Sequence, residues 1–220
     1  FIIDPPTGAI PFLEQPTYEL NRPQFGARYL TGIADASGPE AIPIAERCLI
    51  GFGNTAGPGM MGTLYNSSYQ FVQTDDYLMI MVEMVHDARI IPLFDNAEIA
   101  RENHRPSQLN QWLGDSVGWY EDDTLVIETI NISPLQMSQS SVPISPEGRI
   151  IERMRRHADN EINYRFTVED SKLYSQPWTA ELSFYPLEGR IYEYACHEGN
   201  YSMPGILAGA RRLEREQASN

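Results

Sequence analysis

Residues 115–131, with the sequence DSVGWYEDDTLVIETIN, decide the fold because two strand-like runs flank a polar turn. Asp115 to Tyr120 and Thr124 to Asn131 are rich in β-branched and aromatic residues, which favour strands. Glu121-Asp122-Asp123 supplies the turn between them. This stretch therefore predicts a β-hairpin.

The same combination recurs along the chain. Further hairpins are predicted for Tyr69 to Thr74 with Tyr77 to His86, Arg149 to His157 with Ile162 to Val168, and Thr179 to Tyr185 with Arg190 to Cys196. About eight or nine consecutive strands result, and closing such a meander removes its exposed edges. We expect an all-β fold, an up-and-down antiparallel β-barrel that is lipocalin-like.

The 220 residues fit one β-barrel domain spanning 1–220. We expect a Pro-rich extended arm and loops over 1–65, the barrel meander over 66–200 and a C-terminal tail over 201–220. Short helices are expected between Pro23 and Ala36, from Ala97 to Asn103 and from Leu213 to Gln217. The run Gly51 to Gly59 lacks the Gly-Lys-Ser/Thr ending of a P-loop and is interpreted as a plain loop.

Composition excludes two classes of partner. A formal net charge of -14 would repel a phosphate backbone, so we expect no nucleic-acid partner. No stretch approaches the roughly 20 apolar residues of a spanning helix, so we expect no membrane span. The chain starts at Phe1 and could follow a removed leader. Its Pro-rich arm could embrace a neighbouring subunit in a homo-oligomer.

Cys48 and Cys196 are the two cysteines. They could remain buried thiols or form a disulfide that ties the early part of the chain to the last predicted strand. The sequence has no Cys-x-x-Cys redox or zinc arrangement, which favours the disulfide.

Leu78 to Arg89 carries most of the candidate chemistry. Both faces of this run are apolar, which predicts a central strand packed on both sides. Glu83 would then need an ion pair, with Arg89 or Arg153, or a raised pKa. His86 ends the run, where its ordinary pKa suits proton transfer, although a rim histidine bonded to a carbonyl is the structural alternative.

The last predicted strand adds a second group of polar side chains around His197 and Tyr201. If it neighbours His86, the two imidazoles could converge as proton shuttles, with Glu83 or Asp115 as the carboxylate. Arg89 and Tyr201 would be orienting donors. His104, in a loop, and His157, at a strand end, are discounted.

Apolar and aromatic residues could line a ligand site. The candidates are Met81, Met84, Trp112, Trp119, Trp178 and Tyr194. Core packing would use these side chains equally well. A metal site made of His86, His197 and Glu83 or Asp115 has no supporting His-x-His or His-x-x-x-His spacing, and no nucleotide fingerprint occurs, so we expect no metal and no cofactor.

Several phrases resemble a widespread bacterial family of mostly exported proteins. They are DPPTGAIP from Asp4, ERCL from Glu46, EMVHDARII from Glu83, GDSVG from Gly114, DTLVIET from Asp123, PWT from Pro177 and YACHEGNY from Tyr194. The resemblance implies export, most simply to the bacterial periplasm, and both cysteines as a framework feature, but names no reaction. Residues 119–122 depart from the family's usual Arg-Trp-Glu-Gly turn.

A more limited likeness is to cofactor-independent lyases that open terpene epoxides such as α-pinene oxide. That chemistry needs a proton donor and a base inside an apolar pocket. The leading hypothesis is therefore a cofactor-independent acid/base lyase, isomerase or cyclase acting on a small hydrophobic molecule. The alternatives are a carrier that binds such a molecule without chemistry, and a structural module with a filled interior.

Overall fold

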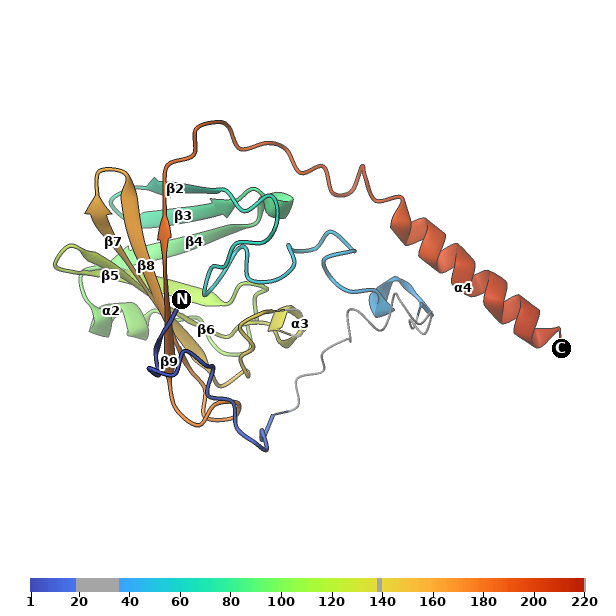
Figure 1. Cartoon of the computed structure of the whole chain (residues 1–220), viewed down its shortest axis with the longest axis horizontal. Helices are drawn as coiled ribbons and strands as arrows, with labels where there is room; N and C mark the ends of the chain where they lie inside the picture. Colours follow the sequence, from blue (N-terminus) through green and yellow to red (C-terminus); the bar gives the residue numbers. More distant parts are fainter. Residues whose placement is uncertain (19–35, 138–139, 220) are drawn as a thin grey trace.

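The computed structural model describes residues 1–18, 36–137 and 140–219, which form one curved sheet of nine strands (Figure 1). The strands are β1 (Ile2–Asp4), β2 (Tyr69–Gln73), β3 (Tyr77–Val82), β4 (Ala88–Phe94), β5 (Asp115–Glu121), β6 (Thr124–Ile130), β7 (Arg149–Ala158), β8 (Glu161–Glu169) and β9 (Trp178–Phe184). Their order across the sheet is β1-β9-β8-β7-β6-β5-β4-β3-β2. The predicted mostly β fold is confirmed.

Three of the predicted hairpins form as expected. β5 and β6 pair from Asp115 opposite Ile130 to Glu121 opposite Thr124, and β7–β8 and β2–β3 are antiparallel neighbours. One junction departs from the predicted antiparallel meander: β4 and β5 run parallel. Because β4 and β5 are parallel, the connection between them, which includes helix α2 (Ala97–Glu102), must cross back to the end of the sheet at which β4 begins.

The central strand predicted from Leu78 to Arg89 is instead a hairpin. β3 ends at Val82, residues Met84–His86 form the 3₁₀ turn η2, and β4 returns beside β3. Val85 and His86 have φ of 57° and 54°, the left-handed region that glycine normally occupies. The turn thus lacks the glycine, proline or asparagine signal that would have revealed it.

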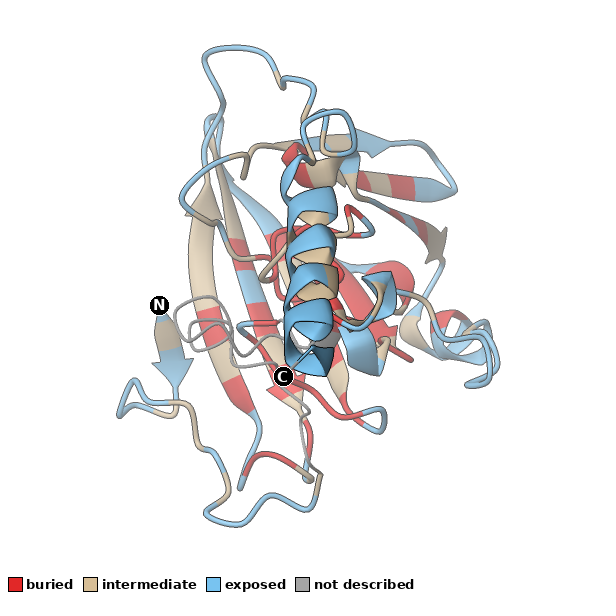
Figure 2. Cartoon of the chain, turned by 90° about the vertical axis from the view of Figure 1, so that its right-hand side faces the viewer, coloured by how far each residue is buried: buried red, intermediate tan, exposed pale blue. Residues whose placement is uncertain are grey.

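The strand predicted from Arg190 to Cys196 is absent, and this segment has no regular structure. It leads into α4 (Ser202–Ala218), which extends well beyond the short helix predicted there and stands away from the sheet (Figure 1). No residue of α4 is buried, and its surface is mostly exposed (Figure 2). None of residues 190–196 is buried, so their alternating sequence pattern does not reflect a buried face.

The sheet is not closed, so hydrogen bonds among the described strands do not form the predicted barrel. β1 and β2 are its two ends. The sheet nevertheless curls until side chains from β2 meet one from β9: the rings of Tyr69 and Phe71 lie 5.2 and 5.8 Å from that of Phe184. Aromatic contacts bring the two sides together where no strand pairing does.

The first 18 residues form the predicted extended arm. β1 pairs with β9, and Leu13 and Thr17 donate backbone hydrogen bonds to the carbonyls of Leu173 and Lys172. The arm thus lies along its own domain. The helix predicted between Pro23 and Ala36 lies outside the described residues.

The two faces of the sheet have separate cores. The inner face carries the main cluster, including Ile80, Ile127 and Phe166. The outer face carries a smaller cluster of Val117, Trp119 and Val126, which α2 covers through Ala100. In Figure 2 the buried segments concentrate along the sheet.

The other described helices are short. They are η1 (Pro39–Ala41) and α3 (Pro134–Met137). α2 matches the prediction for Ala97 to Asn103, and the Asn96 side chain caps it by accepting from Ile99 N. None of the helices in the described part of the chain is long and apolar enough to cross a bilayer.

Candidate functional site

A buried ion pair lies on the inner face of the sheet. Arg89 of β4 donates from Nη1 to Glu152 Oε1 of β7 at 3.0 Å, and its Nη2 donates to Glu152 Oε2. The Tyr164 hydroxyl of β8 donates to the same Oε1 at 2.5 Å. Glu152 and Tyr164 are 0 % exposed. Such a pair persists only if its charges are matched and its polar atoms are hydrogen-bonded.

Hydroxyl groups complete the surroundings of the guanidinium. Arg89 Nη2 also donates to Ser116 Oγ and Thr129 Oγ1, each at 3.1 Å. Burial by itself would lower the pKa of Arg89, but the Glu152 carboxylate outweighs it and the pKa is raised. Burial and the Glu152 charge raise the pKa of Tyr164, so its phenol stays protonated as a donor.

The glycine-rich loop closes over this ion pair. Gly59 N donates to Glu152 Oε1 at 3.3 Å, and Met60 N donates to the Tyr164 hydroxyl at 2.7 Å. Gly57 has φ of 83°, and a Cβ there would lie 2.6 Å from Arg89 Nη1. The glycines thus allow the backbone to approach buried charges closely.

A cleft of about 770 Å³ opens beside the buried network, and we call it the apolar cleft. Its walls come from strands on both sides of the curled sheet. They include Tyr69, Phe71, Leu78, Leu125, Met154, Ile162 and Phe184. The Tyr164 ring lies 5.3 Å from the Phe184 ring, and its hydroxyl donates to Glu152, so Tyr164 connects the buried network to the cleft wall.

Tyr69 connects the cleft wall to the glycine-rich loop. Its hydroxyl donates to the Thr55 carbonyl at 2.6 Å. Burial, followed by the Glu152 charge, raises the pKa of Tyr69 well above its ordinary value. This phenol therefore remains protonated across the physiological pH range.

Polar side chains surround the mouth of the apolar cleft. Asp123 pairs with Arg155 at 2.8 Å, and Glu161 accepts hydrogen bonds from Ser183 and Tyr185. Arg156, Asp159 and Asn160 complete the rim. The charged lining residues are three carboxylates, Asp123, Asp159 and Glu161, and one guanidinium, Arg156, so the mouth does not favour an anion.

The structure places two predicted catalytic residues side by side but not in a cavity. Glu83 is buried and accepts from Tyr192 N at 3.1 Å, whereas His86 is exposed, with Nε2 3.4 Å from Tyr192 O. The residues around 192 thus adjoin the turn that carries His86, as expected, although not as a strand. The ion pairs considered for Glu83 do not form, because Arg89 pairs with Glu152 and Arg153 with Glu121.

The remaining predicted catalytic residues are scattered. His197 is exposed, Tyr201 is 85 % exposed, Arg89 lies in the inner-face ion pair and Asp115 lies on the outer face. The predicted acid/base set therefore occupies several separate places. The rim-histidine alternative, an imidazole beside a backbone carbonyl, describes the environment of His86.

None of the six predicted ligand-binding residues lines the apolar cleft. Trp178 lies in the inner core, Met84 packs with Val82, and Trp119 lies under α2, where Arg101 sits 5.2 Å from its ring centroid. Tyr194 is partly buried beside the Met84 cluster, and Met81 is half-buried on β3. Trp112 lines a different cleft. The core-packing alternative holds for Met84, Trp119 and Trp178.

His104, which sequence reasoning discounted, lies between two carboxylates on the outer face. Its Nδ1 is 2.8 Å from Asp115 Oδ2 and its Nε2 is 3.6 Å from Glu128 Oε1. Burial lowers the pKa of His104, but the hydrogen bond to Asp115 and the proximity of the Glu128 carboxylate outweigh burial and raise it to about 9. The imidazolium is therefore charged at neutral pH, which suits a structural ion pair better than a proton shuttle.

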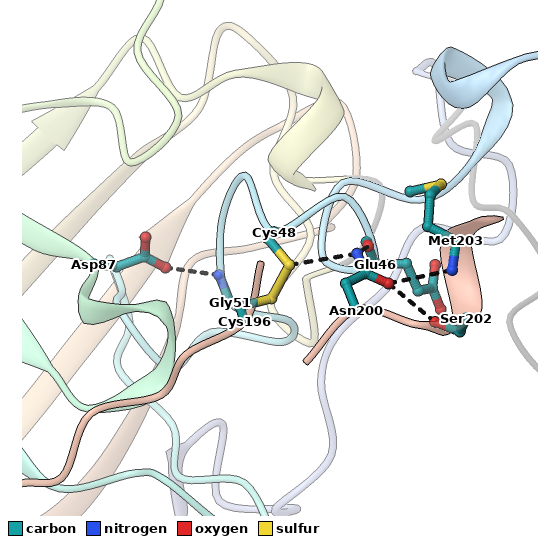
Figure 3. Close-up of a disulfide and its surroundings, with 8 residues drawn as sticks. All are labelled: Glu46, Cys48, Gly51, Asp87, Cys196, Asn200, Ser202 and Met203. Atoms are coloured by element: carbon teal, nitrogen blue, oxygen red, sulfur yellow. Dashed lines mark hydrogen bonds between the residues drawn. A yellow bond between two sulfur atoms is a disulfide. The ribbon is translucent and has the colours of Figure 1, made fainter. Parts of the chain in front are cut away.

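The predicted disulfide between Cys48 and Cys196 is present (Figure 3). Asn200 Nδ2 donates to the Glu46 carbonyl at 2.6 Å, and Asn200 Oδ1 accepts from Met203 N at the start of α4. On the other side of the disulfide, Asp87 Oδ2 accepts from Gly51 N at 2.7 Å. This junction fastens the C-terminal segment to the loop before the glycine-rich run.

Within residues 1–18, 36–137 and 140–219, no group of three or more His, Cys, Asp and Glu side chains is arranged to hold a metal ion. A scan against protein-family models, a search of curated proteins and a search of solved structures each gave no match to this chain. The candidate site therefore rests on its geometry alone, and its central feature is the apolar cleft, whose Phe184 wall packs against Tyr164 of the buried network.

Proposed function

We propose that the protein binds a small hydrophobic molecule in the apolar cleft and carries it without chemical change. The observation that carries this proposal is a cleft of about 770 Å³ whose buried lining residues, Leu78, Leu125 and Met154, are apolar. The charged lining residues Asp123, Arg156 and Asp159 are exposed. Its size falls in the range of small-molecule sites, which are concave, mostly apolar and few per protein.

The side chains that line the cleft favour binding over catalysis. Histidines 86 and 197 are exposed and lie outside the lining residues, and His104 belongs to the outer face. Tyr69 lines the cleft, but its hydroxyl already donates a hydrogen bond to the Thr55 carbonyl. Acid/base catalysis needs a donor and a base that both reach the reacting atoms.

The rim indicates the kind of ligand. Asp159, Glu161 and Arg156 bring charges of both signs to the mouth, while the interior offers aromatic and aliphatic surface. A neutral molecule that is apolar along most of its length, with at most one polar end at the mouth, fits this arrangement best.

A bulky side chain introduced at the mouth of the cleft should block ligand binding and so tests the proposal. Titration with the neutral dye N-phenyl-1-naphthylamine should give a saturable fluorescence increase. Ala158 is exposed and lines the mouth, so Ala158→Trp should weaken binding at least about tenfold, or 1.4 kcal/mol, with little effect on folding.

The matched control places the same side chain elsewhere. Val72 is exposed on β2 and does not line the cleft, so Val72→Trp should leave the affinity unchanged. Equal weakening by both substitutions, or no saturable binding by the unsubstituted protein, would contradict the proposal.

A cofactor-independent acid/base enzyme acting on such a molecule is the second candidate. One observation favours it: the Tyr69 phenol lines the cleft, and Phe184 of the cleft wall packs against Tyr164, whose hydroxyl donates to Glu152. Incubation with α-pinene oxide and analysis of the products by gas chromatography tests it. Turnover that Tyr69→Phe abolishes and His86→Ala leaves intact would favour the enzyme over the carrier.

Export to an oxidising compartment, such as a bacterial periplasm, is part of the same proposal. The Cys48–Cys196 disulfide supports it, because disulfides persist in such compartments and are rare in the cytosol. Alkylation of the protein isolated from its native cells without reductant should then modify neither cysteine. Complete alkylation of both would argue against export.

A further inference from the structure

A second cleft, of about 600 Å³, lies beside the disulfide junction, and we call it the Trp112 cleft. The proposed hydrophobic ligand does not use it, because the two clefts share no lining residue. Its walls come from the loop after Cys48, the start of β4, the loop before β5 and Ser133. The lining residues are Leu49, Ile50, Asp87, Ala88, Asn110, Gln111, Trp112, Leu113 and Ser133.

The Trp112 cleft contains uncommitted hydrogen-bonding groups. No hydrogen bond joins the side-chain amides of Asn110 and Gln111, or the Trp112 indole N–H, to another described residue. Asp87 Oδ2 accepts from Gly51 N, and Asp87 Oδ1 accepts no hydrogen bond within the described chain. Two amides, an indole donor and a carboxylate thus line one hollow.

An aromatic surface accompanies these polar groups. Trp112 is 37 % exposed, so part of its indole surface is open, and Leu49 beside it is exposed as well. The combination of an open indole with amide and carboxylate groups offers both an apolar face and donors and acceptors. One bound molecule could use both.

Fixed backbone holds the walls in place. Gln111 O accepts from both Gly114 N and Ser133 N, which joins the two loops that meet at the cleft. The hydrogen bond from Gly51 N to Asp87 and the disulfide at Cys48 fix the opposite wall (Figure 3). A site whose walls are already positioned loses less conformational entropy when a ligand binds.

We propose that the Trp112 cleft binds a neutral pyranose sugar. The C–H face of a pyranose ring is apolar and can stack on the indole of Trp112, while vicinal hydroxyls can pair with the Asn110 and Gln111 amides and the Asp87 carboxylate. An anionic ligand is disfavoured, because Asp87 lines the cleft and the chain has a formal net charge of -14.

Saturation-transfer NMR with neutral methyl glycosides of glucose, galactose, mannose and N-acetylglucosamine tests this proposal on the full chain. At least one should receive saturation, with a dissociation constant measurable by titration. Trp112→Ala should weaken that binding at least about tenfold, whereas Trp112→Phe should keep most of it because stacking is retained.

Two further variants separate this site from the apolar cleft. Asp87→Asn should weaken sugar binding, and Tyr185→Ala, at the rim of the apolar cleft, should not change it. Thermal unfolding of each variant checks that it is folded. Absence of transfer to all four glycosides, or equal affinity of Trp112→Ala and the unsubstituted protein, would overturn the proposal.

Discussion

The nine-stranded sheet and the C-terminal segment, residues 185–220, are held in different ways. The sheet buries an apolar core on each face and a hydrogen-bonded ion pair within the inner one. The C-terminal segment contributes a 17-residue helix with no buried residue and is fastened mainly by the Cys48–Cys196 disulfide and contacts around Tyr192, Asn200 and Arg211. Burial stabilises the first region, whereas covalent and polar contacts position the second.

The largest effect should come from breaking the ion pair inside the sheet. Arg89→Met would leave the Glu152 carboxylate buried without a countercharge, which costs about 3–5 kcal/mol of unfolding free energy. Urea denaturation measures this loss. Replacing both residues, as Arg89→Met with Glu152→Leu, should restore most of the stability.

Arg153→Met is the matched control. Arg153 lies next to Glu152 on the outer face of β7 and pairs with the partly exposed Glu121. Its loss should cost about 1 kcal/mol or less, because exposed ion pairs contribute little. Equal costs at positions 89 and 153 would remove the distinction between the buried and the exposed pair.

Breaking the disulfide should have the next largest effect. Cys48 and Cys196 are 148 residues apart, and removing a native disulfide typically costs about 2–4 kcal/mol. Hydrogen exchange on Cys48→Ala/Cys196→Ala should accelerate first in residues 185–201, while amides of β5 to β8 keep their order of protection. Faster exchange in β6 and β7 than in the C-terminal segment would contradict the comparison.

The His104 cluster should make the stability of the sheet depend on alkaline pH. Folding raises the pKa of His104 from 6.5 to about 9, so its stabilising contribution is complete below about pH 6.5 and is lost as the pH rises through 9. The loss should be on the order of 2–3 kcal/mol. His104→Gln should flatten the dependence over this range, and an unchanged slope would show that other groups cause it.

The smallest effect is expected from deleting α4. Removing residues 202–220 takes away no buried side chain among 202–218, so the unfolding free energy of the sheet should change by about 0.5 kcal/mol or less. Loss of the Arg211 hydrogen bonds to the carbonyls of Ala36 and Ser37 is included in this figure. A drop of several kcal/mol would mean that α4 belongs to the cooperative unit.

The same contrast explains which parts of the fold the sequence could predict. Hairpins such as β5–β6 and β7–β8 follow from alternating strands around polar turns, and these are local signals. The turn at Val85 and His86 has no such signal, because both residues adopt a left-handed conformation in which glycine or asparagine would be expected. Residues 190–196 alternate like a strand but pair with no strand in the described part of the chain, and they have no regular structure.

The candidate site was harder to predict than the fold. Arg89 was recognised as a functional candidate, but its partner Glu152 is 63 residues away and meets it only through the order of strands across the sheet. His104 likewise meets Glu128 through folding of the connection between β4 and β5. The sequence around the cleft residues Tyr69 and Phe184 shows only an ordinary strand pattern. Their contact depends on the curvature of the whole sheet, which local sequence patterns do not reveal.

Mapping the bound dye by ¹H–¹⁵N NMR tests the central claim most directly. Titration with N-phenyl-1-naphthylamine should shift the amides of Tyr69, Phe71, Ile162 and Phe184 together, along one saturable curve, and leave α4 unchanged. Shifts confined to α4 or to the exposed Leu64 and Tyr65, or no saturable shift at the four cleft amides, would contradict a hydrophobic ligand site inside the curled sheet.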